Sequence, residues 1–198
     1  MRSVDVDTQW PELLARVQAG DERAFSILWR RHQPSLVRYL VIVAGRDVAE
    51  DLAAETWIGV VRTMPRFRGE EAGFKSLLYT TARSRMIDGS RRVKARPLVS
   101  CDLDGLEEPP SVRDDVGSGV EQAEATRGAL TLIARLPAGQ AEVVALRVIA
   151  GLDTDEVARL LAKRAGTVRV AYSRGITTLA RMVGDRDHVT DPDLAAFR

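Results

Sequence analysis

The sequence has few of the side chains that hold transition metals: one cysteine and two histidines in 198 residues. Cys101 alone cannot form an intramolecular disulfide or a cysteine-rich zinc site, and a single thiol suits a reducing cytosol. Only His32 and His188 could contribute to a histidine-based metal site. We therefore expect no metal ion in the functional site.

Long apolar segments are also missing. The longest apolar run, Leu40 to Ala44, is far shorter than the ~20 residues that a membrane-spanning helix needs. The first residues, Met1 to Asp7, carry acids rather than the basic and then apolar pattern of an export signal. The sequence predicts a cytoplasmic protein without membrane insertion.

The chain also lacks an excess of either charge, since 29 Lys and Arg residues balance 28 Asp and Glu residues. This excludes a uniformly basic coat for nucleic acid but not local basic patches. Residues 1–94 hold 16 basic and 12 acidic residues, and residues 123–184 hold 9 and 5. Residues 95–122 hold 2 and 7, together with several Pro and Gly residues. We read this middle segment as a flexible acidic linker between two basic domains.

Apolar residues elsewhere recur at helical spacing, and no alternating strand pattern is visible, so the fold class is all-α. Hydrophobic residues make up 45% of the chain, enough to form a core in each of two small domains. Gly20 should end a first helix, and Asp21 should cap a second one that Pro34 kinks. Asp47 with Glu50 resembles a capping box that starts a third helix. Residues 185–198 are expected to form a flexible tail.

Residues 151–181 contain the strongest local pattern. Asp153 and Glu156 form a capping pair at the start of a short helix, which a tight turn joins to a longer amphipathic helix. This order is typical of a helix-turn-helix, whose second helix enters the DNA major groove. Its outward side chains would be Arg164, Thr167, Arg169, Ser173 and Arg174. The spacing alone does not separate this motif from an ordinary helical hairpin with a solvated basic face.

A second pattern is the basic stretch at residues 62–94, with nine Lys or Arg residues and three acids. Phe67, Phe74 and Tyr79 lie among these cations, and basic residues among aromatics suit single-stranded nucleic acid. Phe74 and Tyr79 also fall in or beside an apolar stripe. The alternative that these two rings belong to the core therefore stays open.

Four acids lie within nine residues: Asp47, Glu50, Asp51 and Glu55. The helix dipole explains acids at a helix start, but Asp51 and Glu55 at i, i+4 repel each other without benefit to the helix. We interpret this acidic cluster as a candidate docking surface for a basic partner.

Together and in this order, the segments resemble the sigma-70 family of RNA polymerase specificity factors, and within it the extracytoplasmic-function (ECF) group. The runs that carry the resemblance are AFSILWRRHQPSLVRYL (24–40), DVAEDLAAETWIGVV (47–61), FKSLLYTTARSRMIDGSRR (74–92) and LPAGQAEVVALRVIAGLDTDEVARLLAKRAGTVRVAYSRG (136–175). The resemblance implies two small helical domains, residues 1–94 and 123–184, joined by the linker.

The resemblance also implies a role for each segment. The acidic cluster would dock on the clamp helices of the polymerase β′ subunit. Residues 62–92 would melt and read the promoter −10 element, with 66–73 as the base-capturing loop. The linker would thread through the active-site cleft and RNA exit channel. The helix-turn-helix would read the −35 element and contact the β-flap. An anti-sigma factor is a candidate further partner.

The residues assigned to each DNA element follow from this comparison. The −10 set comprises Arg66, Phe67, Arg68, Phe74, Lys75, Tyr79, Arg83, Arg85, Arg91 and Arg92. The −35 set comprises Lys163, Arg164, Thr167, Arg169, Ser173 and Arg174. Three positions depart from the family pattern: Lys163 and Arg164 replace an apolar residue and a hydroxyl residue, and Ala171 replaces an Arg.

Two other classes of function compete with this interpretation. An enzyme is disfavoured because no phosphate-binding glycine motif, activated nucleophile or histidine–carboxylate cluster is present, and no cofactor is expected. A stand-alone helix-turn-helix regulator is the alternative that remains. It would bind duplex DNA tightly without polymerase, but it leaves the basic, aromatic stretch 62–94 unexplained.

Overall fold

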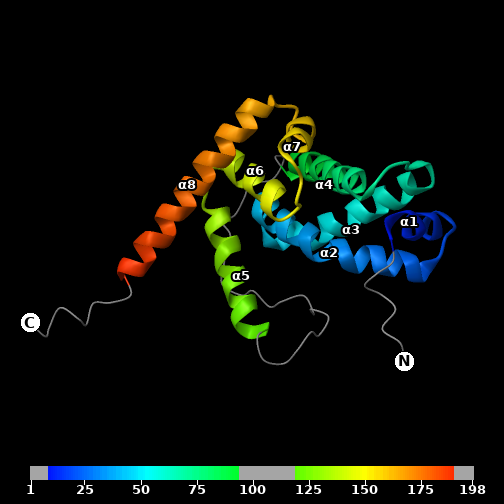
Figure 1. Ribbon diagram of the computed structural model, residues 1–198, viewed down its shortest axis with the longest axis horizontal. Coiled ribbons are helices and arrows are strands. Elements are labelled where there is room, and N and C mark those ends of the chain that lie inside the picture. The colour runs from blue at the N-terminus through cyan, green and yellow to red at the C-terminus, as the bar shows by residue number, and fades with distance from the viewer. Residues whose placement is uncertain (1–8, 94–118, 190–198) are drawn as a thin grey trace, which may run out of the picture.

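The computed structural model describes residues 9–93 and 119–189, and all regular structure in these ranges is helical. The all-α prediction is therefore confirmed. We call residues 9–93 the N-terminal lobe and residues 119–189 the C-terminal lobe (Figure 1). None of the helices in these two ranges has the length and apolar content that a membrane crossing needs.

The N-terminal lobe contains α1 (Trp10–Gln18), α2 (Glu22–Ala44), α3 (Arg46–Thr63), the 3-10 turn η1 (Met64–Arg66) and α4 (Glu71–Val93). The Asp21 side chain caps α2 as predicted, because its carboxylate accepts from the backbone N–H groups of Arg23 and Ala24 at 2.9 and 3.1 Å. Pro34 lies inside α2, which continues through it as one helix. Gly45 then ends α2 at a φ of +92°, which favours glycine.

The predicted capping box at Asp47 and Glu50 is wrong. Helix α3 begins at Arg46 with Gly45 at its N-cap, and no side chain caps it. Asp47 therefore lies in the first turn, where it can still interact with the helix dipole.

The C-terminal lobe contains α5 (Gly119–Ala134), α6 (Ala138–Val148), α7 (Thr154–Leu160) and α8 (Ala165–Val189). The capping box of α7 is present: Glu156 N donates to Asp153 Oδ1, and Asp153 N donates to Glu156 Oε2, both at 2.7 Å. Close packing holds α8 on α6, because a Cβ at Gly175 would lie 2.7 Å from Val144 Cγ2.

The structure corrects two predicted boundaries. Residues 119–122, assigned to the linker, belong to α5, and residues 185–189, assigned to the tail, continue α8. The rest of the predicted linker (from residue 95) and of the predicted tail lies outside the described residues.

The two lobes pack directly against each other, α6 against α2 and α7 against α4 (Figure 1). One continuous apolar core crosses between them. It includes Leu36, Tyr39 and Leu40 of α2 and Val143 and Leu146 of α6. The charge pattern predicts two lobes, whereas their contact is a finding of the structure.

Candidate nucleic-acid interface

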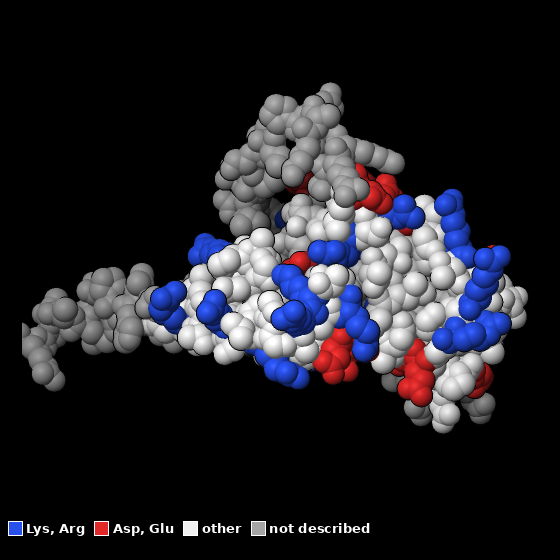
Figure 2. Space-filling view, turned by 90° about the horizontal axis from the view of Figure 1, so that it is seen from above, with Lys and Arg blue, Asp and Glu red and all other residues white. Residues whose placement is uncertain are grey.

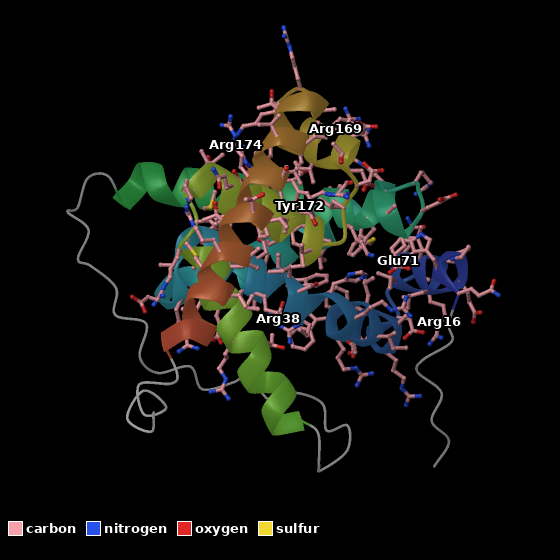
Figure 3. All side chains as sticks on the ribbon, turned by 60° about the vertical axis from the view of Figure 1, so that its left-hand side comes forward. Arg16, Arg38, Glu71, Arg169, Tyr172 and Arg174 are labelled. Atoms are coloured by element: carbon pink, nitrogen blue, oxygen red, sulfur yellow. The ribbon has the colours of Figure 1, made fainter. Side chains whose placement is uncertain are left out.

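The helix-turn-helix places every predicted −35 residue on the surface. Helix α7 braces α8 through Val157, Leu161 and Val168, which are all buried. The turn between the helices requires a positive φ of +52° at Ala162. The outward side of the turn and of α8 then carries the exposed residues Lys163, Arg164, Thr167, Arg169, Ser173 and Arg174. Figure 3 shows Arg169 and Arg174 pointing away from the body of the molecule.

A second set of contacts fixes α8, and the sequence pattern did not reveal it. The Arg147 guanidinium lies over the Tyr172 ring, 5.5 Å from its centroid. Its Nη1 also donates to the Leu152 carbonyl at 2.7 Å, immediately before the cap of α7. One arginine thus links α6, the start of the motif and the middle of α8. No local spacing signals this contact, because the three groups come together only in the folded lobe.

The α3–α4 connection, residues 64–70, contains two exposed cations of the basic stretch. Arg66 and Arg68 are exposed. Arg68 Nη1 donates to the carbonyls of Pro65 and Phe67 at 3.1 and 2.7 Å, so this side chain folds over its own loop. The predicted loop 66–73 is shorter than expected, because α4 begins at Glu71 and includes Gly73.

The aromatic residues of the basic stretch are mainly core residues, which corrects the prediction at Phe74 and Tyr79. These side chains are 0% and 1% exposed. A ring with no exposed surface cannot stack on a base unless the domain opens. Burial raises the pKa of Tyr79 to about 12, and its ring packs edge-on against Tyr39 at 5.3 Å. Phe67 is half-buried and packs edge-on against Phe74 at 6.2 Å.

The cations of α4 differ in how accessible they are. Arg83 Nε donates to Glu142 Oε1 of the other lobe at 2.9 Å. Arg85 packs over Gly59 of α3, with its Nη2 3.4 Å from where a Cβ would lie. Lys75 is half-buried. Arg91 and Arg92 lie in α4, but their side chains are outside the described part of the structure.

The acidic cluster of α3 is on the surface. Asp47, Glu50, Asp51 and Glu55 are all exposed. Three apolar side chains of the same helix are exposed as well: Val48, Ile58 and Val61 at 42, 53 and 48%. Asp51, Glu55 and Ile58 follow at helical spacing, so acids and apolar groups share one outer stripe. The sequence pattern indicated the acids but not the exposure of their apolar neighbours, because isolated apolar residues are common on protein surfaces and give no signal of their own.

Helix α1 contacts the α3–α4 connection, which sequence reasoning also missed. The Gln18 amide Nε2 donates to the carbonyls of Met64 and Phe67 at 3.0 and 2.8 Å. Trp10 Nε1 donates to the Gly69 carbonyl at 2.9 Å. Trp10 and Gln18 are eight residues apart and share a helix face, but that spacing does not indicate which segment of the chain they contact.

The two exposed basic regions are far apart on the surface. Figure 2 shows Lys and Arg around the start of α8 and again at the far end of the N-terminal lobe, with mostly uncharged surface between them in this view. No group of His, Cys, Asp and Glu in the described ranges has an arrangement that could hold a metal ion. The exposed cations and small polar groups at the start of α8 are side chains that can bond an anionic partner.

Comparison with known families gives two matches along this chain. The Sigma-70 region 2 family matches residues 28–96, and the Sigma-70, region 4 family matches residues 127–179. The ECF RNA polymerase sigma factor SigM of Mycobacterium tuberculosis is 32% identical over 87% of this chain and 84% of its own length. The chain belongs to the ECF group of the sigma-70 family.

A second relative of this ECF factor is longer. ECF RNA polymerase sigma factor BldN of Streptomyces coelicolor is 32% identical over 88% of this chain, but the match spans 66% of BldN. Among solved structures, CnrH in complex with the cytosolic domain of CnrY shares the fold, with a TM-score of 0.56 and 19% identity over 87% of this chain and 96% of that chain.

The family matches cover most elements of the ECF factor, but not all of them. The region 2 match begins at Leu28, within α2, and the region 4 match ends at Leu179, within α8. Helix α1 and its contacts with the α3–α4 connection therefore involve a segment that lies outside the region 2 match.

Proposed function

We propose that this ECF factor binds core RNA polymerase and directs promoter-specific initiation of transcription, without catalytic activity of its own. It would act in the cytoplasm, where polymerase and promoter DNA are found. The observation that carries the proposal is the combination, in one chain of this family, of an exposed helix-turn-helix on one lobe and an exposed basic loop on the other.

The start of α8 is suited to the −35 element as duplex. Arg169 lies one turn into the helix and is exposed, and an arginine in this position can bond the O6 and N7 of a guanine bidentately. Thr167 and Ser173 are small enough to allow close approach to the groove. Lys163 and Arg164 lie at the positive end of the helix dipole, where neighbouring cations destabilise a helix unless phosphates approach them. We assign Arg164 to the backbone and Arg169 to a base.

The α3–α4 connection is suited to the unpaired −10 strand. Arg66 and Arg68 supply charge at its exposed surface, and the half-buried Phe67 supplies one ring at its edge. Lys75 and Arg85 would extend this surface along α4. Arg83 belongs to the same surface, but in the packed arrangement it is bound to Glu142.

Simultaneous reading of both elements requires the lobes to separate. Positions −10 and −35 are about 85 Å apart along B-DNA, given a rise of about 3.4 Å per base pair. A compact chain of 198 residues has a radius of gyration of about 16 Å and is therefore roughly 40 Å across. The packed lobes cannot span that distance. The packed arrangement, in which Arg83 is bound to Glu142, is thus that of the free factor. Polymerase would hold the two lobes apart.

The outer stripe of α3 is our candidate polymerase contact. Its acids provide charge for a basic partner, and Val48, Ile58 and Val61 provide exposed apolar area for the same contact. An anti-sigma factor is a second candidate partner. CnrH, which has the same fold, was solved in complex with the cytosolic domain of CnrY, and this complex supports the candidate.

Run-off transcription with purified core RNA polymerase, with and without this chain, tests the proposal. We expect transcripts from specific start sites only when the chain is present. The stand-alone regulator predicts the opposite pattern: tight, sequence-specific binding to duplex DNA without polymerase and no effect on the start sites that core polymerase uses.

A further inference from the structure

Three hydrogen bonds from α1 pin the α3–α4 connection from one side. Gln18 donates to the carbonyls of Met64 and Phe67, and Trp10 donates to the carbonyl of Gly69. These acceptors lie at the start, middle and end of residues 64–70. Each of the three hydrogen bonds joins residues that are at least 46 positions apart in the sequence. The connection contains only one 3-10 turn of its own, so its shape depends on such outside contacts.

The backbone at the end of the connection is constrained as well. Gly69 has a φ of +157°, and a Cβ there would lie 3.2 Å from the Phe67 ring. That ring packs edge-on against Trp10 with centroids 6.5 Å apart, and Trp10 packs on Phe74 at 5.3 Å. Trp10 therefore fixes both the Gly69 carbonyl and the side of the Phe67 ring.

The same contacts reach the exposed cations of the connection. The Phe67 carbonyl accepts from Gln18 at 2.8 Å and from Arg68 Nη1 at 2.7 Å. Gln18 thus holds the acceptor on which the Arg68 guanidinium rests. Moving that carbonyl would move the exposed charge, even though Gln18 itself is half-buried and lies in another helix.

We propose that α1 is a positioning element for −10 recognition, with Trp10 and Gln18 as positioning residues that set its sequence selectivity. This inference rests on the proposed function, in which the α3–α4 connection captures a −10 base. Neither residue touches DNA. Both hold the loop backbone in one conformation before DNA binds, so that Arg66, Phe67 and Arg68 meet the unpaired strand in a fixed arrangement. A captured base is discriminated by geometry, and a loosened loop would accept more sequences.

The test uses substitutions that delete the donors and keep an apolar side chain in the same place. Trp10→Phe removes the indole N–H and keeps a ring in the aromatic cluster. Gln18→Met removes the amide and keeps the chain length. Glu12→Gln changes an exposed residue of α1 that is not part of the contacts described, and it serves as the matched control. Duplex templates randomised at both promoter elements are transcribed with core polymerase and the full chain, and productive templates are sequenced.

The quantity to compare is the ratio of transcription from the best −10 sequence to transcription from its single-base substitutions. For Trp10→Phe/Gln18→Met we expect this ratio to fall about fivefold, while core association stays at the parent value. Glu12→Gln should leave both unchanged. A purely structural brace would lower transcription from all templates by one common factor. That result, or an unchanged ratio, would overturn the proposal.

Two further measurements separate the possible failures. If the double variant loses its helical circular dichroism, Gln18→Met alone decides by the same ratio, because it leaves the aromatic cluster intact. Failure of the parent chain to initiate on any template would instead reject the proposed function. An Arg66→Ala/Arg68→Ala variant that keeps the parent's −10 preference would also reject it, because the α3–α4 connection would then not recognise the −10 element.

Discussion

Arg83 of α4 and Glu142 of α6 form an ion pair between the two lobes, with Nε and Oε1 2.9 Å apart. The Glu142 side chain is 15% exposed, so water screens the pair only in part. The carboxylate also lies near the buried Tyr39, whose pKa is raised well above its usual range by burial first and by Glu142 second. A residue of the proposed −10 surface is thus bound to the lobe that carries the −35 reader.

Removing this ion pair should loosen the contact between the lobes. Glu142→Gln removes the negative charge that faces the half-buried Arg83 and keeps only a neutral acceptor oxygen, which should cost about 1–2 kcal/mol of interface stability. With a protease site inserted within residues 102–118, we expect the cleaved parent fragments to elute together in gel filtration and the Glu142→Gln fragments to separate. Arg135→Gln, an exposed change in the same lobe, is the control. Parent fragments that separate on their own would show that the packed arrangement is not stable in solution.

Stability should fall at mildly acidic pH because of His32. Burial, with help from Lys75 and Arg31, lowers the pKa of His32 to about 4, from 6.5. The folded state therefore binds fewer protons than the unfolded state between these values. The contribution of His32 to the free energy of unfolding is fully present above pH 6.5. It is lost as pH falls toward 4, by about 2–3 kcal/mol at pH 4.5.

Urea unfolding of the parent and of His32→Gln across this pH range checks this. His32→Gln leaves every other titratable group of the chain in place, so the difference between the two slopes isolates His32. Equal slopes would mean that folding does not lower the pKa of His32.

The two arginines at the start of α8 should behave differently. Arg169→Ala should cost about 1–3 kcal/mol on some −35 sequences and little on others, because a lost base contact matters only where that base is present. Arg164→Ala should weaken binding by a similar factor on all sequences and make the salt dependence shallower by about one unit. Titrations of labelled duplexes at several salt concentrations measure both effects. Base-specific loss for Arg164→Ala, with none for Arg169→Ala, would reverse the two assignments.

Reversing charge on the outer stripe of α3 should weaken polymerase association. We expect Asp51→Lys/Glu55→Lys to bind core polymerase at least tenfold more weakly, if each acid contributes about 1 kcal/mol or more to a partly desolvated contact. Glu12→Lys/Asp155→Lys makes the same charge change at exposed acids of other helices. Fluorescence anisotropy of the labelled factor gives the affinities. Equal affinities for both variants would move the docking surface elsewhere.

Contacts between near neighbours in the chain were accessible from the sequence. Asp21 caps α2 through residues two and three positions ahead, and Asp153 pairs with Glu156 three positions ahead. Helical periodicity also placed Arg164, Thr167 and Arg169 on the outer side of their helix, because 3.6 residues per turn decide which side chains share a face. At Asp47 the same reasoning failed, because backbone geometry at Gly45 started the helix without a side-chain cap.

Contacts between distant residues were decided only by the tertiary structure. The sequence could not tell whether Phe74 and Tyr79 face the core or DNA, because both lie near the edge of an apolar stripe, and packing against α1 and α2 settled it. Arg83 and Glu142 are 59 positions apart, as are Trp10 and Gly69. No periodic pattern links such positions. Sequence by itself determined an all-α chain with an exposed basic recognition helix, because those features follow from local hydrogen bonding and from the period of the helix. Tertiary packing decided which cations remain exposed and what holds the α3–α4 connection in place, because both depend on how separate helices meet.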